Sequence, residues 1–350
     1  MELQEIVNPL LDWYETAKRD LPWRRDPSFY HVWLSEIMLQ QTRVQAVKEY
    51  YQRFLTRLPT IHDLATVPVD ELLKLWEGLG YYNRARNLQK AAQVIETTYG
   101  GIPPHDYETL LTLPGIGEYT AGAIASICYQ EKVPAIDGNV LRVMMRLMND
   151  SSDITLPATK KTLFQTLQNI LPAEVGDFNQ ALMELGALIC LPNGEPKCAE
   201  CPLHHICLAH QHQTVLSLPV KTKKKARRTE KKTVLLMVQY NQVALLKRPA
   251  TGLLAGLWMF PLLEGHQSPD EVLTWIKDQG LYPIRILELD SAKHIFTHLE
   301  WNMKGYVVFV SEVGGTFTWA SHQELRTKYA IPTAVTKYQE ALEEVMHQNL

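Results

Sequence analysis

Glu36 is the first residue whose surroundings could give it a chemical role. If residues 30–42 form a helix, Val32, Trp33 and Leu39 lie beside it at i−4, i−3 and i+3. Apolar neighbours penalise the charged form of a carboxyl group, so we expect a raised pKa for Glu36. Such a group can keep a proton ready for a leaving group. The alternative is a structural glutamate that is hydrogen-bonded within the core.

Asp137 is the second candidate, because it stands directly before the helical pattern Val140–Met148 and beside Gly138. A carboxylate at a helix N-terminus is stabilised as the anion, although most aspartates in such a position are simply N-caps. Two carboxyl groups, one kept protonated and one kept ionised, form an acid and a cation stabiliser. Cleavage of a glycosidic bond through an oxocarbenium-like transition state needs both.

Four of the five cysteines gather in one short stretch with the spacing C-x7-C-x2-C-x5-C. They are Cys190, Cys198, Cys201 and Cys207. Four thiolates so close in sequence can surround one tetrahedral metal ion or one iron–sulfur cluster. Zinc with His204 or His205 in place of one thiolate is the alternative. Five cysteines are too few for a disulfide scaffold in a chain of this length.

The stretch Leu113-Pro-Gly-Ile-Gly-Glu-Tyr-Thr-Ala-Gly122 lies between two helical segments. Gly115 and Gly117 permit a tight turn, after which the N–H groups of a new helix point outward. Such an N-terminus suits a phosphate oxygen and would hold nucleic acid without reading its sequence. The alternative is an ordinary connection between two helices.

The elements that would position these residues change type along the chain. Up to about Leu188, apolar residues recur at helical spacing and Pro or Gly marks the breaks, which predicts an all-α region. The clearest helical segments are Val44–Leu58, Val69–Gly78, Ala85–Tyr99 and Val140–Met148. After Lys232, β-rich runs mix with helical patterns, which predicts an α+β region. Its expected strands are 233–239, 242–246, 284–289, 304–311 and 315–319, and its expected helices are 269–279 and 335–347.

The chain has 350 residues, enough for two or three domains, and its net charge is −3. This small net charge conceals a basic stretch, since Ser217–Lys232 holds eight basic residues and one acidic residue. We interpret it as a linker that is either a solvated tether or a contact for phosphate. The chain contains no apolar run of membrane-spanning length, and its first residues lack a signal-peptide pattern. A cytoplasmic protein without a membrane partner is therefore expected.

The hairpin glycines and the cysteine cluster together resemble the helix-hairpin-helix DNA glycosylases of the endonuclease III superfamily. Three further motifs, Trp33–Thr42, Gly78–Tyr82 and Ile136–Val140, resemble those of the MutY-type adenine DNA glycosylases. The resemblance covers nearly the whole chain. It implies an enzyme of base excision repair that removes adenine mispaired with 8-oxoguanine or guanine in double-stranded DNA. It also implies a monomer that associates with the nucleoid when bound to DNA.

The resemblance assigns roles to the candidate residues. Glu36 matches the general acid, Asp137 the carboxylate that stabilises or transiently bonds the sugar C1′, and Tyr119 and Asn139 residues that assist around the sugar. Bifunctional members place a Schiff-base lysine at the position of Tyr119, and a phenol cannot form an imine. We therefore expect base removal without efficient strand cleavage.

Other residues match positions that contact DNA or hold cofactors. Gln41, Leu79 and Tyr81 match residues that wedge or probe the duplex after the base is everted, and Arg24 lies near the adenine pocket. Their alternative is ordinary packing, above all for Leu79. The implied cofactors are one [4Fe–4S] cluster per chain and a monovalent cation at the hairpin when DNA is bound. The first cysteine gap has seven residues where the family usually has six, and the turn at Asn193-Gly194 could absorb the extra one.

The C-terminal part resembles the MutT-like (Nudix-type) domain of the same enzymes, most closely over 244–261. The glutamate cluster of Nudix hydrolases is missing, so pyrophosphatase activity is not expected. Phe296, Thr297 and His298 resemble the Phe-Ser-His loop that recognises 8-oxoguanine, with Thr297 in place of serine. The alternative is a strand end with a surface histidine.

The predicted fold is therefore multi-domain, all-α followed by α+β. Residues 1–216 form the helix-hairpin-helix glycosylase domain with the cluster motif at 190–207, residues 217–232 the basic linker, and residues 233–350 the MutT-like 8-oxoguanine recognition domain. Two other functions remain open. One is a thymine or uracil mismatch DNA glycosylase, and the other is a non-catalytic iron–sulfur protein that binds DNA or senses redox state.

Overall fold

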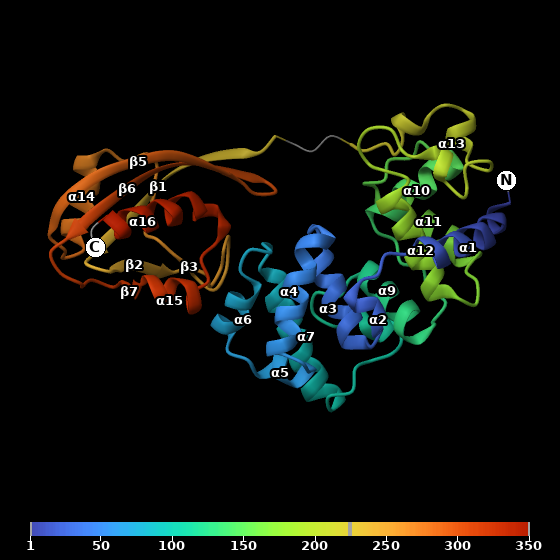
Figure 1. Ribbon diagram of the computed structural model, residues 1–350, viewed down its shortest axis with the longest axis horizontal. Helices are drawn as coiled ribbons and strands as arrows, with labels where there is room; N and C mark the ends of the chain where they lie inside the picture. Colours follow the sequence, from blue (N-terminus) through green and yellow to red (C-terminus); the bar gives the residue numbers. More distant parts are fainter. Residues whose placement is uncertain (1, 223–225, 349–350) are drawn as a thin grey trace. The chain divides into compact units, whose positions relative to one another are not determined.

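A computed structural model describes residues 2–222 and 226–348 (Figure 1). The chain divides into two compact units. Unit 1 contains residues 1–66 and 87–224, and unit 2 contains residues 67–86 and 225–350. Residues 223–225, at the centre of the predicted basic linker, lie outside the described part of the chain.

Unit 1 is helical, as predicted, and residues 2–222 contain no strand. None of the described helices is long and apolar enough to cross a membrane. The helices of unit 1 are α1 (Val7–Ala17), α2 (Pro22–Arg25), α3 (Phe29–Leu39), α4 (Val44–Arg57), α5 (Ile61–Thr66), α7 (Asn83–Tyr99, which begins in unit 2), α8 (Tyr107–Leu110), α9 (Glu118–Tyr129), α10 (Gly138–Met148), α11 (Pro157–Gln168), α12 (Val175–Leu188) and α13 (Leu208–Gln211).

The predicted helical segments in this half are confirmed within two residues at each end. The helix expected over 30–42 is shorter, because α3 ends at Leu39 and Gln41 takes a left-handed conformation with φ 57°. Glu36 still lies inside the helix with the apolar neighbours that were expected. The early end of α3 turns the chain at the point where Gln41 reaches the surface.

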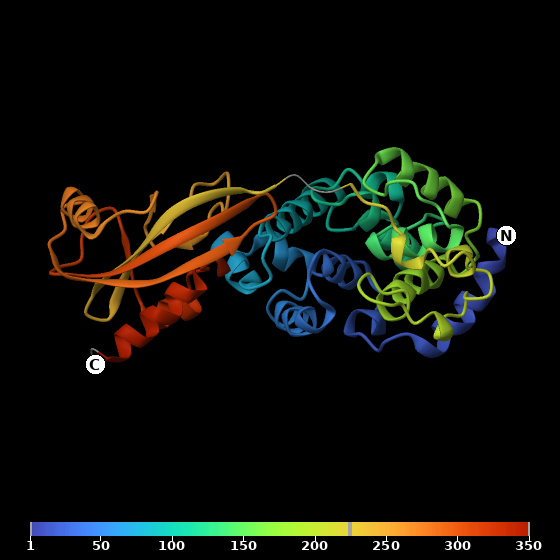
Figure 2. The same cartoon turned by 90° about the horizontal axis from the view of Figure 1, so that it is seen from above.

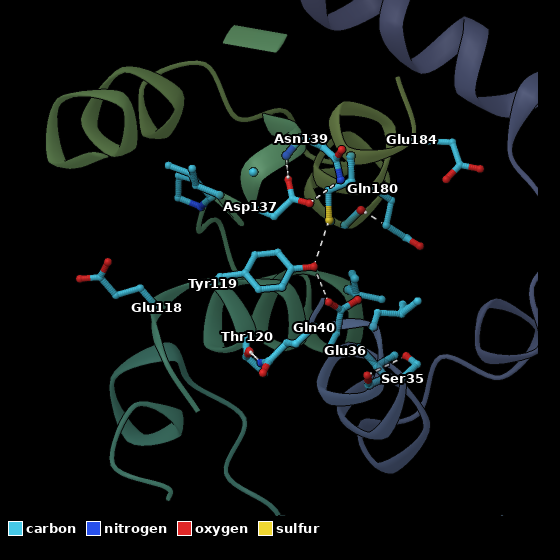
Figure 3. A pocket seen from close by; sticks show the side chains of 18 of the residues that line it. Ser35, Glu36, Gln40, Glu118, Tyr119, Thr120, Asp137, Asn139, Gln180 and Glu184 are labelled. Carbon is cyan, nitrogen blue, oxygen red and sulfur yellow. Dashed lines mark hydrogen bonds between the residues drawn. The ribbon is translucent and has the colours of Figure 1, made fainter. Parts of the chain in front are cut away.

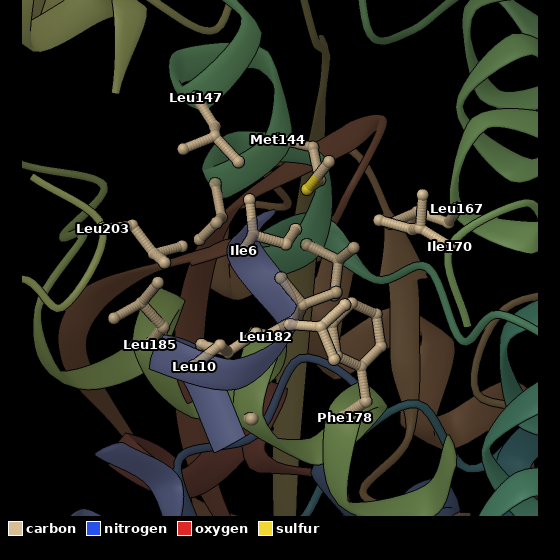
Figure 4. Close-up of a cluster of buried hydrophobic side chains, with 14 of the residues drawn as sticks. Ile6, Leu10, Met144, Leu147, Leu167, Ile170, Phe178, Leu182, Leu185 and Leu203 are labelled. Carbon is tan, nitrogen blue, oxygen red and sulfur yellow. The ribbon is translucent and has the colours of Figure 1, made fainter. Parts of the chain in front are cut away.

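A large core of unit 1 forms where α1, α10, α11 and α12 pack together (Figure 4). Ile6, Leu10, Met144, Phe178 and Leu182 are fully buried in it. Three of the four clustered cysteines pack against the edge of this core. The thiol-bearing loop is therefore anchored on the same apolar cluster that holds α10 and α12 in place.

Close approach between backbones sets the position of α9. A Cβ atom added at Gly122 would lie 2.4 Å from the carbonyl oxygen of Pro134, which belongs to the segment leading to Asp137. Gly115, in the hairpin, has φ 79°, and a Cβ atom there would lie 2.6 Å from Cβ of Asn87. Both positions therefore require glycine, which also explains the turn that the sequence predicted.

Unit 2 contains a seven-stranded mixed sheet with the order β3-β2-β1-β6-β5, in which β4 also pairs with β1 and β7 with β2. The long strands β1 and β6 run parallel, and the other pairs are antiparallel. The strands are β1 (Arg228–Gln239), β2 (Gln242–Lys247), β3 (Trp258–Met259), β4 (Leu262–Glu264), β5 (Pro283–Ile295), β6 (Leu299–Val310) and β7 (Thr318–Ser321), and the helices are α6 (Val69–Trp76), α14 (Pro269–Asp278), α15 (His322–Thr327) and α16 (Thr336–Gln348).

Both faces of this sheet are covered. Alternate residues of β1 enter two separate cores, Val234 and Leu236 on one face and Leu235 and Met237 on the other. The first core is closed by α15 and α16 and the second by α14 (Figure 2). The strand is consequently apolar at every position from Val234 to Val238, which explains the β-rich run in the sequence.

The structure narrows the predicted linker from both ends. Leu218 is buried in unit 1, where its carbonyl accepts a hydrogen bond from Nε of Arg146 at 3.0 Å. Strand β1 begins at Arg228, which pairs with Leu299 of β6. Lys232, within this strand, is buried, and its ammonium group lies 2.6 Å from the Glu264 carboxylate. These contacts are tertiary, so the polar composition of residues 221–232 did not reveal them.

The α6 segment belongs to unit 2 through polar contacts with α15 and the chain that follows it. Nζ of Lys74 donates to the carbonyls of Leu325 and Tyr329 at 2.8 and 3.0 Å. The Glu77 carboxylate accepts from the backbone N–H of Ile331 at 2.7 Å. Residues 67–86 thus pack with the C-terminal part of the chain, although they precede α7 in sequence.

We expect Gly122→Ala to lower the free energy of unfolding by about 2 kcal/mol, because the new methyl group meets the backbone of Pro134 and the helices must shift apart. Urea unfolding followed by circular dichroism measures this loss. Gly117→Ala is the matched control, since Gly117 has φ −97° and open space around its Cβ position. Equal stability of the two variants would contradict the close packing of α9.

Candidate active site

A cleft of about 1650 Å³ in unit 1 brings the two predicted carboxylates together. Its walls come from α3, the start of α9, the N-terminus of α10, one face of α12 and the connection between α1 and α2. Glu36, Tyr119, Asp137 and Asn139 all line it (Figure 3). Four residues that are as much as 103 positions apart in sequence therefore share one cavity.

Glu36 is buried, with 7% of its surface exposed. Burial is the largest influence on its carboxyl group and raises the pKa of Glu36 to about 7, with the negative charge of Asp137 acting in the same direction. The hydrogen bond from Tyr119 and the positive charge of Arg24 oppose this increase. The raised pKa predicted from the apolar neighbours is thus confirmed, and the group can be protonated near neutral pH.

Tyr119 connects the hairpin to this carboxyl group. Its O–H group donates a hydrogen bond to Oε2 of Glu36 and lies 3.3 Å from the sulfur of Met183. Burial and the two nearby carboxylates raise the pKa of Tyr119 well above its ordinary value. The phenol therefore stays neutral and acts as a hydrogen-bond donor in the cleft.

Asp137 caps α10, as the sequence predicted. Its Oδ1 accepts from the backbone N–H groups of Asn139 and Val140, both at 2.8 Å, and its Oδ2 accepts from Nδ2 of Asn139 at 2.7 Å. These hydrogen bonds lower the pKa of Asp137, as the helix N-terminus predicted, but burial has the larger effect and the net change in its pKa is upward. The N-cap signal is local and contained no information about burial.

Arg142 of α10 holds Asn139 from the other side. Its Nη2 donates to Oδ1 of Asn139 at 2.9 Å and to the carbonyl of Gly186 at 2.7 Å, and its Nε donates to the carbonyl of Cys190 at 2.7 Å. A chain of hydrogen bonds therefore runs from Asp137 through Asn139 and Arg142 to the first of the clustered cysteines. The sequence analysis did not identify Arg142.

Glu184 is the second residue that the sequence analysis missed. It lies on α12, is 1% exposed, and lines the cleft together with Arg19 and Arg24. Its carboxylate binds both guanidinium groups. Its partners lie 160 and 165 residues away, so no local spacing could have indicated the cluster. An acid within the apolar stretch 181–188 of α12 was the only local signal.

Comparison with known proteins shows the family to which the chain belongs. Residues 34–185 match the family described as HhH-GPD superfamily base excision DNA repair protein, and residues 233–341 match the NUDIX domain. An adenine DNA glycosylase of Mus musculus is 34% identical over 395 residues, which covers 94% of this chain and 76% of the relative. One from Buchnera aphidicola subsp. Baizongia pistaciae is 36% identical and covers 87% and 86%. The chain belongs to the adenine DNA glycosylase family.

Solved structures of related glycosylases agree with the fold of the helical half. A thermostable thymine-DNA glycosylase has a TM-score of 0.55 and 30% identity, covering 60% of this chain and 97% of that chain. A trapped endonuclease III–DNA covalent intermediate has a TM-score of 0.51 and 26% identity, covering 61% and 99%. The helical half of this chain is thus similar in fold to a thymine-DNA glycosylase and to endonuclease III.

The four cysteines that the family resemblance assigns to a cluster lie at one edge of unit 1. Electrostatic interactions connect Cys190 with each of the other three thiols, and Nη1 of Arg146 lies 3.3 Å from Sγ of Cys190. Within the described residues, no three Cys, His, Asp or Glu side chains are arranged to hold a single metal ion. The donor set itself, four thiols near one guanidinium, has the chemistry that an iron–sulfur cluster requires.

Two further observations concern the cysteine loop 190–207. His204 and His205, the alternative ligands, are exposed and pack against each other with ring centres 5.4 Å apart. Gly194 is exposed with φ 72°, in the turn that we predicted would absorb the additional residue of the first cysteine gap. The identity of the bound group and the place of the extra residue stay predictions.

The residues predicted to probe the duplex divide between the units. Gln41 is exposed at the cleft of unit 1, as is Gly117 at the hairpin. Leu79 and Tyr81 belong to unit 2, where Leu79 is 7% exposed and Tyr81 is 50% exposed with φ 47°. Burial of Leu79 favours the packing alternative for that residue in this structure.

Phe296, Thr297 and His298 form the turn between β5 and β6. Phe296 packs against Trp301 with ring centres 5.0 Å apart, whereas Thr297 and His298 are exposed. Oη of Tyr81 lies 3.5 Å from Oγ1 of Thr297 within unit 2. Two segments predicted to contact the mispair are therefore neighbours, although 216 positions separate them.

We expect Glu36→Gln to stabilise the protein at pH 8. A folded-state pKa of about 7, above the ordinary 4.5, means that the stability supplied by protonated Glu36 is complete below about pH 4.5 and is lost as pH rises through 7. Glutamine cannot ionise, so the variant should gain on the order of 3 kcal/mol at pH 8 and little at pH 4.5.

Urea unfolding across this pH range, followed by tryptophan fluorescence, tests the prediction. Glu49→Gln, at an exposed position of α4, is the matched control and should show no such gain. If the two variants respond to pH in the same way, burial of Glu36 does not determine its protonation.

Proposed function

We propose that this protein removes adenine mispaired with 8-oxoguanine or guanine from double-stranded DNA by hydrolysing the N-glycosidic bond. The observation that carries the proposal is the paired arrangement of Glu36 and Asp137 in one cleft. The first carboxyl group is buried without a charged partner bonded to it, and its pKa is about 7. The second is held by three N–H donors.

In the proposed reaction, Glu36 gives its proton to N7 of the everted adenine. The bond between C1′ and N9 then breaks, its electron pair stays with the base, and positive charge develops on the sugar. Asp137 stabilises this charge as a carboxylate, because a fixed anion beside a developing cation interacts strongly with it where bound substrate excludes water. Water adds to C1′, and its proton passes to the Glu36 carboxylate, which regenerates the acid.

Tyr119 and Asn139 position these two groups in the proposal. The phenol donates to Glu36 and keeps the carboxyl group oriented, and Nδ2 of Asn139 donates to Asp137. A phenol has no amine with which to form an imine at C1′. The proposed enzyme is therefore monofunctional and leaves an intact strand with a site that lacks its base.

We also propose that Cys190, Cys198, Cys201 and Cys207 hold one [4Fe–4S] cluster. When bound, the cluster would cross-link the loop 190–207 through four iron–thiolate bonds. Arg146 donates to the first thiol and to the carbonyl of Leu191, so it would fix this loop beside the cluster. Arg142 donates hydrogen bonds to the carbonyl of Cys190 and to Asn139, so a fixed position of the loop would also fix Asn139 and thereby support the orientation of Asp137.

Contacts with DNA are proposed for both units of a protein that acts as a monomer. The hairpin at Gly115–Gly117 precedes α9 and suits a phosphate group, with a monovalent cation at the hairpin when DNA is bound. Gln41 and Tyr81 would probe the vacated duplex, Arg24 would meet adenine, and the turn 296–298 would recognise 8-oxoguanine. The exposure of Tyr81, Thr297 and His298 supports these assignments.

The proposed function predicts that Asp137→Asn loses adenine excision by about 10²–10³-fold and keeps its affinity for the duplex. Asparagine retains the shape of the side chain but lacks the charge that opposes the oxocarbenium ion. Single-turnover release of the base from duplexes with 8-oxoguanine:A, G:A and G:T pairs measures the effect. Excision at the wild-type rate by the variant would refute the role of Asp137.

The wild-type enzyme in the same assay separates the candidate functions. Adenine release from 8-oxoguanine:A and G:A supports the proposal. Thymine release from G:T would instead establish a mismatch glycosylase that removes thymine. No release from any duplex, with binding intact, would establish a non-catalytic DNA-binding protein.

The turn between β5 and β6 gives a separate prediction about specificity. His298→Ala should reduce the preference for 8-oxoguanine:A over G:A by about tenfold, because one hydrogen-bond donor or acceptor at the exposed turn is lost. The ratio of the two single-turnover rates measures this preference. His266→Ala, in unit 2 but away from this turn, is the control. An unchanged ratio in His298→Ala would show that the turn does not read the opposite base.

A further inference from the structure

A single buried carboxylate in the cleft binds two arginines. Oε1 of Glu184 accepts from the backbone N–H of Arg19 at 2.9 Å and from its Nε at 2.7 Å, and Oε2 accepts from its Nη2 at 2.8 Å. Nη1 and Nη2 of Arg24 donate to the same two oxygens at 3.2 and 2.9 Å. Nη1 of Arg24 also donates to the carbonyl of Arg19 at 3.0 Å.

All three side chains line the cleft that holds Glu36. Glu184 lies on α12, Arg19 lies in the connection between α1 and α2, and Arg24 lies within α2. The cavity-facing residues of α12 recur at helical spacing: Gly176, Asp177, Gln180, Met183, Glu184 and Ala187. The three charged groups are thus part of the cavity wall rather than of the core.

The charges in this cluster do not balance. Two guanidinium cations share the Glu184 carboxylate, so these three groups together carry one net positive charge, while Asp177 on the same face of α12 also lines the cleft. The charge of Arg24 acts on Glu36. One arginine would suffice to satisfy a structural carboxylate, and buried ion pairs contribute little to net stability. Each guanidinium also has five N–H groups, more than these hydrogen bonds use.

We propose that Glu184 is a positioning residue that holds the guanidinium groups of Arg19 and Arg24 at the cleft wall, where they donate hydrogen bonds to ring nitrogens of the everted base. The inference rests on the proposed function, because it takes the cleft to be the base-binding site. Adenine carries several ring nitrogens that accept hydrogen bonds, and planar guanidinium groups suit planar acceptors. The carboxylate fixes both groups before the base arrives, which lowers the cost of ordering them on binding.

The decisive variant is Glu184→Gln, which keeps the size of the side chain and removes its charge. We expect its single-turnover rate of adenine release to fall by between about 10- and 100-fold, because small displacements of positioning groups have effects of this size. Affinity for the full duplex should change by less than about threefold, since the contacts of the phosphates are unaltered. A duplex with a 2′-fluorinated adenosine, which resists cleavage, is the probe for affinity.

The pH dependence of the rate shows whether Glu184 positions the two arginines and compensates their charge or only stabilises the fold. Besides Arg24 on α2, Glu36 interacts with Tyr119 and Cys128 on α9 and with Asp137 before α10. Loss of the Glu184 charge leaves the positive charge of Arg19 and Arg24 uncompensated, which favours the ionised form of Glu36. The decline of the rate at alkaline pH should therefore move to lower pH in Glu184→Gln. Glu184→Asp, which keeps the charge, should restore the wild-type position of this decline.

Asp20→Asn is the matched control. Asp20 lies in the same connection and binds Arg25, but it is exposed and does not line the cleft. Its rate and pH profile should equal those of the wild type. A wild-type rate in Glu184→Gln overturns the inference. The inference also fails if the rate falls only in proportion to the amount of folded protein, measured by circular dichroism, and the pH profile does not shift.

A readout without activity separates this inference from the proposed function. Nε–H of Arg19 should exchange with solvent slowly in the wild type and at least about tenfold faster in Glu184→Gln, as observed by nitrogen-resolved NMR of the arginine side chains. If the wild type releases no adenine, the proposed function fails. Unchanged exchange in the variant would instead refute the positioning by Glu184.

Discussion

The proposed chemistry of this protein depends on the removal of water from one carboxyl group. Burial of Glu36 raises its pKa to about 7, and this requires the helices around it to approach closely. Three glycines allow that approach. An added Cβ would lie 2.4 Å from the backbone at Gly122, 2.8 Å from the carbonyl of Ser126 at Gly176, and 2.6 Å from Cβ of Asn139 at Gly186. The spacing of α9, α10 and α12 that these glycines set also brings Tyr119, Asp137 and Glu184 to the same cleft.

Burial alone cannot give the two carboxyl groups different roles, because it raises the pKa of both. Their hydrogen bonds make the difference. Glu36 accepts one O–H group from Tyr119, whereas Asp137 accepts three N–H groups that are fixed by the start of α10 and by Asn139. N–H donors stabilise the anion specifically, because an N–H group cannot accept the hydrogen bond that a protonated carboxyl group would donate. Arg142 donates hydrogen bonds to Asn139 and to the carbonyl of Cys190, so the hydrogen bonding of Asp137 also depends on the position of the Cys190 loop.

The sequence predicted the features that depend on local interactions and missed those that depend on tertiary packing. Helical periodicity and Pro or Gly breaks are local, so α4, α6, α7, α10 and α14 were predicted within two residues at each end. The two-residue strand β3 and the three-residue strand β4 are too short to show alternation, and both were missed. Glu184 and Arg19 are 165 residues apart, and only tertiary packing joins them. The raised pKa of Asp137 was missed for the same reason, because its N-cap position is visible in sequence and its burial is not.

The division into units separates two tasks within the proposed function. The residues assigned to chemistry, from Glu36 to Asn139, lie in the cleft of unit 1, whereas Tyr81 and the turn 296–298 lie in unit 2. The segment 67–86 joins unit 2 through Lys74 and Glu77, so Tyr81 is held by the C-terminal part of the chain although it precedes α7. Reading of the opposite base and protonation of adenine therefore depend on different sets of packing contacts. Changes in the core of the sheet can then alter the choice of mispair while the environment of Glu36 stays the same.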